Sequence, residues 1–435
     1  MKPRTLGAWL AYLEQLHPVA IDMGLDRSRQ VFQRLGLGPL APRVITVTGT
    51  NGKGSTCAFL ASLLAGQGLR VGVYSSPHLL RYNERVRLDG AEATDAQLCA
   101  AFEAVEAARG EVSLTYFEMG TLAAFWLFAS AGLDAVVLEV GLGGRLDTVN
   151  LVDADLALIT SIGIDHADYL GNTRESVAFE KAGILRAGRP ALCGDLDPPQ
   201  PLLEKARALG CPLSLRGHEF NLRQHDGGWD WQGQAADGTP LRLSDLPWLD
   251  LPMENAALAL QAFALLGLPW EEGSIARALQ ATRVTGRLDR REVSWKGKRV
   301  RVLLDVGHNP HAAQYLRGRL PVIPAPGMRR AVFGLLADKD LPGVIEPLLG
   351  SVAAWAVAPL PSPRSRSADE LQAALSNLGA VTTSHGSVEA ALEHHCELAG
   401  PGDEVLVFGS FFCVADALPW IERHGVEVAA DGSAG

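Results

Sequence analysis

The stretch from residue 44 to residue 64 constrains the fold of this chain more than any other. Residues 44–47 (VITV) favour a β-strand, residues 48–55 (TGTNGKGS) are a glycine-rich turn, and residues 57–64 (CAFLASLL) favour an apolar helix. The glycines let backbone N–H groups converge on an anion at the helix N-terminus, and Lys53 adds a full positive charge. The order of strand, loop and helix predicts a phosphate-binding loop whose Ser55 hydroxyl is placed for a phosphate-bound Mg²⁺.

The spacing of this loop, G-x-x-G-K-G-S, is tighter than the general G-x-x-x-x-G-K-[ST] pattern. Residues 48–55 resemble the ATP loop of the Mur ligase superfamily and, within it, of the folylpolyglutamate synthases. The alternative is a glycine turn with a solvated lysine, which the order of strand, loop and helix disfavours. The resemblance implies ATP binding by Thr50, Asn51, Gly52, Lys53, Gly54 and Ser55, with Lys53 also catalytic.

Composition limits the possible partners. The chain has 435 residues, enough for two or three domains, and a net charge of −10, which disfavours nonspecific binding to nucleic acid or to an anionic membrane. Six cysteines without a C-x-x-C pair indicate reduced thiols. The N-terminus does not resemble a signal peptide, and the longest apolar stretch, residues 122–133, is too short to span a bilayer. We expect a cytoplasmic monomer that acts on small molecules.

A second strong signal lies in residues 134–147 (DAVVLEVGLGGRLD). The apolar run predicts a buried parallel strand, and Glu139 at its carboxyl end has the position of a metal-directed acid in a nucleotide-binding sheet. The alternative is a capped strand followed by a flexible turn.

Two other predicted strands end in polar residues. Ser76 follows the strand at 70–74, and Asp165 and His166 follow the apolar run that begins at residue 156. On pattern alone, Ser76 favours a strand-exit turn and His166 a packed or surface histidine. The resemblance instead implies that two Mg²⁺ ions are bound by Ser55, Ser76, Glu139 and His166, with Asp165 orienting the imidazole.

Lys181 ends a predicted helix at 174–181, where a lysine is usually a solvated charge favoured by the helix dipole. The resemblance implies that this lysine reacts with CO₂. The resulting carbamate is an anion that can sit beside Mg²⁺, which makes Lys181 both a catalytic residue and a metal ligand. The resemblance also assigns Asn255, Arg287 and Asp305 to ATP, although Asn255 alone would equally be a helix cap.

Three segments, residues 22–25, 115–118 and 146–148, resemble the dihydropteroate pocket of the family. Without the resemblance, the first segment is a turn, and Tyr116 and Phe117 in the second segment are core aromatics. The implied pocket residues are Asp22, Met23, Gly24, Leu25, Thr115, Tyr116, Phe117, Glu118, Leu146, Asp147 and Thr148.

The alternation of strands and helices predicts an α/β fold in two domains. We expect a P-loop-containing, parallel-sheet ATPase domain at 1–290, a linker at 291–298, a smaller Rossmann-like α/β domain at 299–428 and a disordered tail at 429–435. In the second domain the resemblance implies a catalytic His308 and a glutamate site formed by His308, Asn309 and Ser410.

The resemblance as a whole implies an ATP-dependent carboxylate–amine ligase with two activities. It would add L-glutamate to dihydropteroate and to the γ-carboxylate of reduced folates, through an acyl phosphate. A peptidoglycan-precursor ligase would place a further domain before the ATP loop, whereas only 48 residues precede Gly49. A folylpolyglutamate synthase without the first activity remains an alternative. A P-loop kinase or an ATP-gated binding module would explain the loop and Glu139, but not the second domain.

Overall fold

The computed structural model describes residues 5–426, which form two compact units divided between Arg283 and Val284. The predicted boundary at residue 290 is therefore seven residues late. The predicted tail at 429–435 lies outside the described residues.

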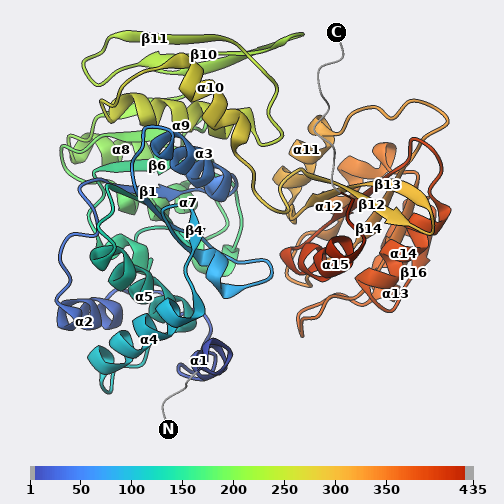
Figure 1. The fold of residues 1–435 in the computed structure, drawn as a ribbon, viewed down its shortest axis with the longest axis horizontal. Coiled ribbons are helices and arrows are strands. Elements are labelled where there is room, and N and C mark those ends of the chain that lie inside the picture. The colour runs from blue at the N-terminus through green and yellow to red at the C-terminus, as the bar shows by residue number, and fades with distance from the viewer. Residues whose placement is uncertain (1–4, 427–435) are drawn as a thin grey trace. The chain divides into compact units, whose positions relative to one another are not determined.

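The first unit, coloured blue to yellow in Figure 1, is built on an eight-stranded sheet. Its strand order is β4-β3-β2-β5-β1-β6-β7-β8. The strands β2, β5, β1, β6, β7 and β8 are parallel, and β3 and β4 are antiparallel additions at one edge. The four strands that precede the predicted phosphate and metal residues are thus neighbours, and their carboxyl ends share one edge of the sheet. The bounds are β1 (Val44–Thr48), β2 (Val71–Tyr74), β3 (Val86–Leu88), β4 (Ala91–Glu92), β5 (Ala135–Glu139), β6 (Leu156–Ile159), β7 (Ala191–Cys193) and β8 (Leu213–Leu215).

Helices cover both faces of this sheet, because alternate strand residues point to opposite sides and both sets are apolar. One face packs against α3 (Lys53–Ala65) and, beside it, α9 (Met253–Leu265), which contacts β6 and β7; α10 (Glu272–Ala281) packs on α3. The helices that share the core of the other face are α1 (Leu6–Leu13), α2 (Asp26–Leu35), α4 (Asp95–Arg109), α5 (Tyr116–Ser130), α7 (Arg174–Lys181) and α8 (Gln200–Ala208). Shorter helical turns are η1 (Tyr82–Arg85), η2 (Thr148–Leu151), α6 (Ala167–Leu170) and η3 (Ala182–Ile184).

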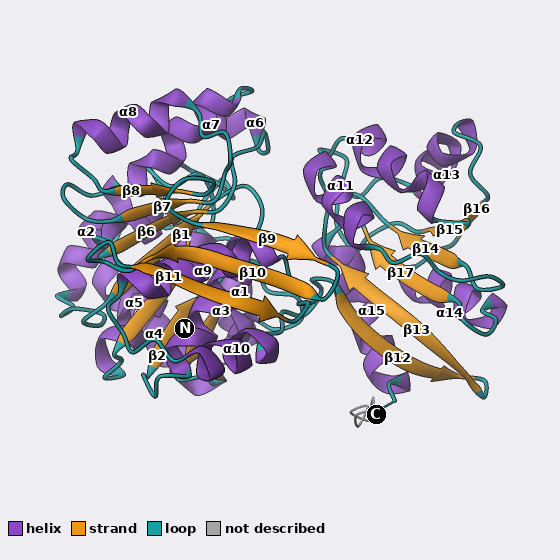
Figure 2. Cartoon of the chain, turned by 90° about the horizontal axis from the view of Figure 1, so that it is seen from above, coloured by secondary structure: helices purple, strands orange, loops and turns teal. Residues whose placement is uncertain are grey.

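A three-stranded antiparallel sheet packs on α9 (Figure 2). It comprises β9 (Asn221–His225), β10 (Gly228–Gln234) and β11 (Pro240–Leu246). Trp229 and Trp231 lie on one face of β10, are fully buried, and donate their indole N–H groups to Pro247 O and Ala257 O.

The second unit has a six-stranded sheet in the order β12-β13-β17-β14-β15-β16, parallel except for β12. The predicted linker at 291–298 is wrong, because these residues belong to the hairpin of β12 (Asp289–Trp295) and β13 (Lys298–Asp305). The pattern missed it because Arg290, Arg291 and Glu292 are charged edge-strand residues. The remaining strands are β14 (Arg329–Phe333), β15 (Ala354–Val357), β16 (Thr382–Ser384) and β17 (Glu404–Phe408). The helices are α11 (Pro310–Arg319), α12 (Leu341–Ile345), η4 (Glu346–Ser351), α13 (Ala368–Asn377), α14 (Val388–Leu398) and α15 (Phe411–His424).

Among residues 5–426, no helix combines the length and the apolar character needed to cross a membrane.

Candidate active site

The phosphate loop connects β1 to α3 in the predicted order. Hydrogen bonds hold it to the residues that follow β6: Thr50 N donates to Ser161 O at 2.9 Å, and Thr160 Oγ1 donates to Asn51 O at 2.6 Å. Thr50 Oγ1 also donates to Gly163 O at 2.8 Å. The β6 exit thus fixes the shape of the loop before any ligand binds.

Two loop glycines are required by geometry. Gly49 has φ +154°, and a Cβ added there would lie 1.8 Å from Thr160 Oγ1. Gly52 has φ +88°, and its added Cβ would lie 2.5 Å from Asn255 Oδ1. Any larger residue would force apart the loop, the β6 exit and α9.

Lys53 and Ser55 both face the loop backbone. Lys53 Nζ donates to Gly49 O at 3.0 Å, so the ammonium lies over the peptide groups that would surround a phosphate. Ser55 Oγ donates to Gly52 O at 3.2 Å and accepts a hydrogen bond from Asn255 Nδ2 at 2.8 Å. The predicted ATP residues Ser55 and Asn255 are therefore brought together across 200 residues of sequence.

The predicted metal residues Ser76 and Glu139 also meet. Glu139 is the last residue of β5 and is buried, and its Oε2 accepts a hydrogen bond from Ser76 N at 3.2 Å. A Cβ added to Gly54 would lie 3.7 Å from the same oxygen, which places this carboxylate against the phosphate loop. Serine hydroxyl and carboxylate oxygens are the hard donors that Mg²⁺ prefers.

His166 is an exposed residue at the start of α6 and has φ +52°. Its backbone N–H donates to Asp165 Oδ1 at 2.9 Å, so this carboxylate fixes the main chain of the histidine. His166 follows β6, next to β1 in the sheet, and so belongs to the same edge as Ser76 and Glu139.

Lys181 is the buried end of α7, with 2% of its surface exposed. Burial, followed by repulsion from Lys53, lowers its pKa to about 7, while Asp165 acts in the opposite direction. A large share of this side chain is therefore a neutral amine near neutral pH, which is the form that reacts with CO₂. Lys53 and Asp165 thus lie close enough to Lys181, the lysine predicted to be carbamylated, to change its pKa.

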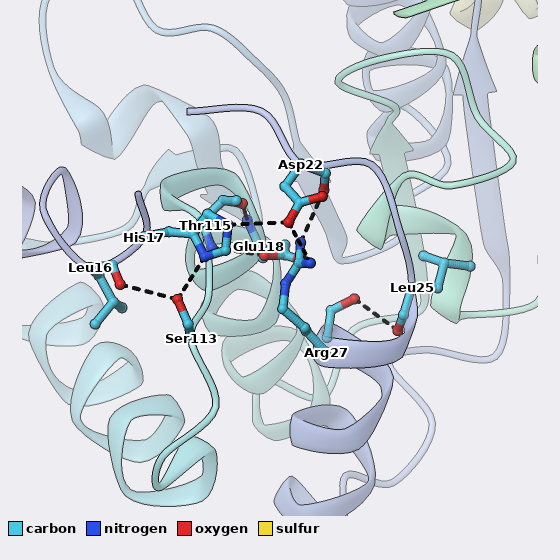
Figure 3. Close-up of polar contacts among 9 residues, drawn as sticks. Leu16, His17, Asp22, Leu25, Arg27, Ser113, Thr115 and Glu118 are labelled. Carbon is cyan, nitrogen blue, oxygen red and sulfur yellow. Dashed lines mark hydrogen bonds and ion pairs between the residues drawn. The ribbon is translucent and has the colours of Figure 1, made fainter. Parts of the chain in front are cut away.

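Arg27 joins the pocket segment at residues 22–25 to the pocket segment at residues 115–118 (Figure 3). Its Nη1 lies 2.6 Å from Asp22 Oδ2, and its Nη2 donates to Glu118 Oε1 at 3.1 Å. His17 Nε2 lies 3.2 Å from the same Asp22 oxygen, and its Nδ1 is 2.6 Å from Ser113 Oγ. Sequence reasoning missed Arg27 because an arginine in the first turn of a helix resembles a solvated charge.

Glu118 is buried and completes a capping box with Thr115, whose backbone N–H donates to Glu118 Oε2 at 2.8 Å. The buried carboxylate therefore has two tasks, capping α5 and holding Arg27. Met23 lies near Gly143, since a Cβ added to that glycine would be 3.7 Å from Met23 Cε. Leu25 is the residue before α2, and Gly24 has open space around it.

The third pocket segment, residues 146–148, lies close to the second, residues 115–118, at Phe117. A Cβ on Gly141 would lie 2.6 Å from the Phe117 ring and 3.3 Å from Asp147 Oδ2. Asp147 is buried and accepts hydrogen bonds from Leu142 N and Val149 N, both at 2.9 Å. Burial raises its pKa to about 6, against the opposing effects of these backbone N–H groups and of Lys53. Leu146 and Thr148 flank it, half-buried and buried, so the three predicted segments form one contiguous region.

The predicted residues of the second unit gather where β13 and β17 end. Asp305 is buried and accepts hydrogen bonds from Gly307 N at 2.8 Å and Leu288 N at 3.1 Å, and burial raises its pKa. The Arg287 guanidinium partly offsets that effect and lies 5.2 Å from the centre of the Phe411 ring.

His308 Nδ1 lies 2.8 Å from Val306 O. A carbonyl only accepts, so Nδ1 carries a proton, and in the neutral form of the ring Nε2 carries the lone pair. Asn309 and Ser410 are buried N-caps, which accept from Ala312 N and Phe412 N and begin α11 and α15. Two of the three predicted glutamate-site residues thus have a capping role at neighbouring strand ends.

His395 and Cys396 are buried in α14, which packs against β14 and β15 of the second unit. His395 Nε2 donates to Ala331 O at 3.1 Å.

Comparison with known proteins places these features in a family. Residues 47–191 match the Mur ligase middle domain, and residues 286–411 match the Mur ligase glutamate ligase domain. The chain is 46% identical over 419 residues to the dihydrofolate synthase/folylpolyglutamate synthase of Escherichia coli, covering 96% of both chains. This chain belongs to the dihydrofolate synthase/folylpolyglutamate synthase family. The Haemophilus influenzae member is 44% identical over 434 residues, covering 96% of this chain and 98% of that one.

Solved structures of dihydrofolate synthase/folylpolyglutamate synthase proteins have the same fold. E. coli FolC in complex with DHPP and ADP aligns with a TM-score of 0.90 at 45% identity, covering 97% of this chain and 99% of that one. The Yersinia pestis enzyme complexed with AMPPNP and Mn ion aligns with a TM-score of 0.88 at 45% identity and the same coverage. A further structure of the family, with a TM-score of 0.88, has Mn, AMPPNP and L-glutamate bound. The predicted α/β fold and family resemblance are confirmed.

Proposed function

We propose that this chain joins L-glutamate to dihydropteroate and to the γ-carboxylate of reduced folates, with ATP as the energy source. The observation that carries the proposal is the shared edge of β2, β5, β1 and β6, where a phosphate loop meets Ser76, Glu139 and Lys181. This edge provides what a reaction between two anions needs, namely positive charge and oxygen ligands for a divalent metal. The family relationship supports the same activity.

The first step is phosphoryl transfer. A carboxylate oxygen of the acceptor attacks the γ-phosphorus of ATP, the bond to the β-phosphate oxygen breaks, and ADP leaves. Lys53 and the backbone N–H groups of the loop offset the charge on the transferred group. Asn255 holds the Ser55 hydroxyl in place, and Arg287 and Asp305 of the second unit are proposed to contact the nucleotide.

The donor set fits Mg²⁺. We propose that Ser55, Ser76, Glu139, His166 and the Lys181 carbamate would hold two ions, since this set is dominated by hard oxygen donors and its carboxylate is buried at the sheet edge. When bound, Mg²⁺ supplies charge neutralisation at the phosphates. The protein's own part is to orient Glu139 through the Ser76 N–H and to lower the pKa of Lys181 through burial, so that a share of its amine is neutral and can react with CO₂.

The second step forms the amide. The amine of L-glutamate attacks the acyl phosphate carbonyl, the carbon–oxygen bond to phosphate breaks, and inorganic phosphate leaves. The amine must lose a proton, and we propose that His308 Nε2 accepts it, because its Nδ1–H is held by Val306 O. Asn309 and Ser410 would contribute to glutamate binding through the helix ends that they cap.

The acceptor pocket is proposed to comprise the three joined segments around Asp22, Glu118 and Asp147. The Tyr116 and Phe117 rings offer flat apolar surfaces for a pteroate moiety, and the carboxylates offer acceptors for its N–H groups. We further propose that the protein works as a monomer in the cytoplasm. Sedimentation of the purified chain tests the first point, and fractionation of cells that express it tests the second.

The direct test is ADP release by the purified chain with dihydropteroate, with tetrahydrofolate or with neither, each with and without glutamate. We expect one ADP per amide formed, and turnover only when acceptor and glutamate are both present. If tetrahydrofolate plus glutamate supported turnover and dihydropteroate plus glutamate did not, the dihydropteroate activity would be removed from the proposal. ATP hydrolysis that does not depend on glutamate would contradict the ligase function.

A further inference from the structure

Arg85 lies between two parts of the proposed active site. It is the last residue of η1, and its carbonyl oxygen accepts a hydrogen bond from Ser75 N at 2.9 Å. The main chain of Arg85 is therefore fixed beside the segment that carries Ser76. Its half-buried side chain extends to Tyr116, which belongs to the proposed acceptor pocket.

The surroundings of the guanidinium are aromatic and uncharged. Its central carbon lies 5.4 Å from the centre of the Tyr82 ring and 5.6 Å from that of Tyr116. Its Nε donates to His78 Nδ1 at 2.8 Å, so this histidine is neutral and carries its proton on Nε2. The guanidinium also interacts with the Tyr74 hydroxyl. These contacts hold the side chain in position without neutralising it.

No carboxylate of residues 5–426 forms an ion pair with Arg85. The adjacent acid, Glu84, is occupied by the N–H groups of Leu79, Leu80 and Arg81, all at 2.7 Å. A half-buried guanidinium without a carboxylate partner is unusual, because charged groups away from water are normally paired. Its planar set of N–H donors matches a carboxylate.

We propose that Arg85 binds the α-carboxylate of the terminal glutamyl group of a reduced-folate acceptor. The proposal rests on the proposed function. In such an acceptor the glutamyl group lies between the aromatic portion and the reacting γ-carboxylate. Arg85 has the corresponding position, between the Tyr116 ring and the main chain beside Ser76.

The non-reacting carboxylate is the better partner for chemical reasons. A strong ion pair with the attacking carboxylate would stabilise the ground state and would weaken as that group gives its charge to phosphorus. An ion pair with the α-carboxylate remains unchanged throughout the reaction. Dihydropteroate has no glutamyl group, and its single carboxylate is the one that reacts. Arg85 is therefore a specificity-determining residue, needed for one acceptor and not for the other.

The test compares the two acceptors in the full-length Arg85→Gln variant, with ATP and glutamate saturating. We expect the KM for tetrahydrofolate to rise about ten- to hundredfold, the range for losing a charge-assisted hydrogen bond, and the KM for dihydropteroate to change less than about threefold. Arg85→Lys should recover part of the loss. Arg87→Gln is the matched control, because Arg87 lies two residues away, is exposed and pairs with Glu92.

A substrate analogue tests the same contact without a mutation. Tetrahydrofolate with its α-carboxylate converted to the amide should show a raised KM in the wild-type chain and no further rise in Arg85→Gln. Equal KM values for acid and amide in the wild type would overturn the proposal, as would equal effects of the variant on both acceptors. A wild-type chain that ligates glutamate to neither acceptor would instead overturn the proposed function.

Discussion

The backbone N–H of Ser76 donates a hydrogen bond to Oε2 of Glu139 at 3.2 Å, joining the ends of β2 and β5. Glu139 is the last residue of β5 and Ser76 lies just beyond the end of β2, so the register of these neighbouring parallel strands sets their separation. The bond orients a buried carboxylate whose charge would otherwise be costly to keep away from water. A preformed acidic ligand next to the phosphate loop is the basis of the proposed chemistry.

Asn255→Ala should raise the KM for ATP about tenfold, the effect of one lost hydrogen bond at a buried site. The amide holds the Ser55 hydroxyl from α9, and removing it frees that side chain to rotate. Steady-state kinetics with ATP as the varied substrate provide the measurement. Gln261→Ala is the control, since Gln261 is buried in the same helix and bonds only to β10. An unchanged KM for ATP in Asn255→Ala would contradict the proposed role of this residue.

Lys181→Arg should lower kcat on the order of a hundredfold or more, the loss typical of removing an electrostatic catalytic group. Arginine keeps the positive charge but does not form a stable carbamate. In the wild type, activity should fall in CO₂-free buffer and return on adding bicarbonate.

The wild type and Lys181→Arg also allow the carbamate to be detected directly. With ¹³C-bicarbonate, we expect a carbamate carbonyl signal in the NMR spectrum of the wild type that is absent from Lys181→Arg. Full wild-type activity without CO₂ would show that Lys181 works unmodified.

Arg27→Ala should raise the KM for dihydropteroate about tenfold or more while the KM for ATP stays within about twofold, because the guanidinium orients Asp22 and balances buried Glu118. Arg27→Lys should restore part of the binding, but not the two-sided contact that a guanidinium makes. The control is Arg29→Ala, on the same helix and exposed. Parallel rises in the KM of every substrate, together with lower stability, would indicate a purely structural role.

The stability of the second unit should depend on pH through His395. Burial lowers the pKa of this ring to about 3, from an ordinary value of 6.5, so the folded protein keeps it neutral. Below about pH 6.5 the unfolded chain binds a proton that the folded chain does not, and stability falls as pH decreases, by at most about 1.4 kcal/mol per pH unit.

Thermal unfolding of the full chain between pH 7 and pH 5 provides the test. In His395→Gln, whose amide can still donate to Ala331 O, the decrease assigned to the second unit should be smaller than in the wild type. Equal slopes in the two proteins would rule out His395 as the source.

The residues at the sheet edge could be predicted from the sequence because each lies at or just after the carboxyl end of an apolar strand. The order of the strands in the sheet then brings these residues together. Glu139 is recognisable from the run that precedes it, and Lys53 from its glycines. Arg27 and Arg85 could not be recognised from the sequence. Arg27 matters through Glu118, a partner far along the chain, and Arg85 matters because no carboxylate of residues 5–426 forms an ion pair with it. Residues 291–298 were mistaken for a linker because β12, the first strand of the hairpin, is a charged edge strand. The burial of His395 likewise depends on packing that no local pattern records.

The central claim is that the edge formed by β2, β5, β1 and β6 binds two divalent ions with ATP. Electron paramagnetic resonance of Mn²⁺, titrated into the full chain with a nonhydrolysable ATP analogue, measures this most directly. We expect two bound Mn²⁺ per wild-type chain, and a loss of at least one in Glu139→Gln, which keeps the shape of the side chain but not its charge. Two ions bound with unchanged affinity in Glu139→Gln would contradict the account.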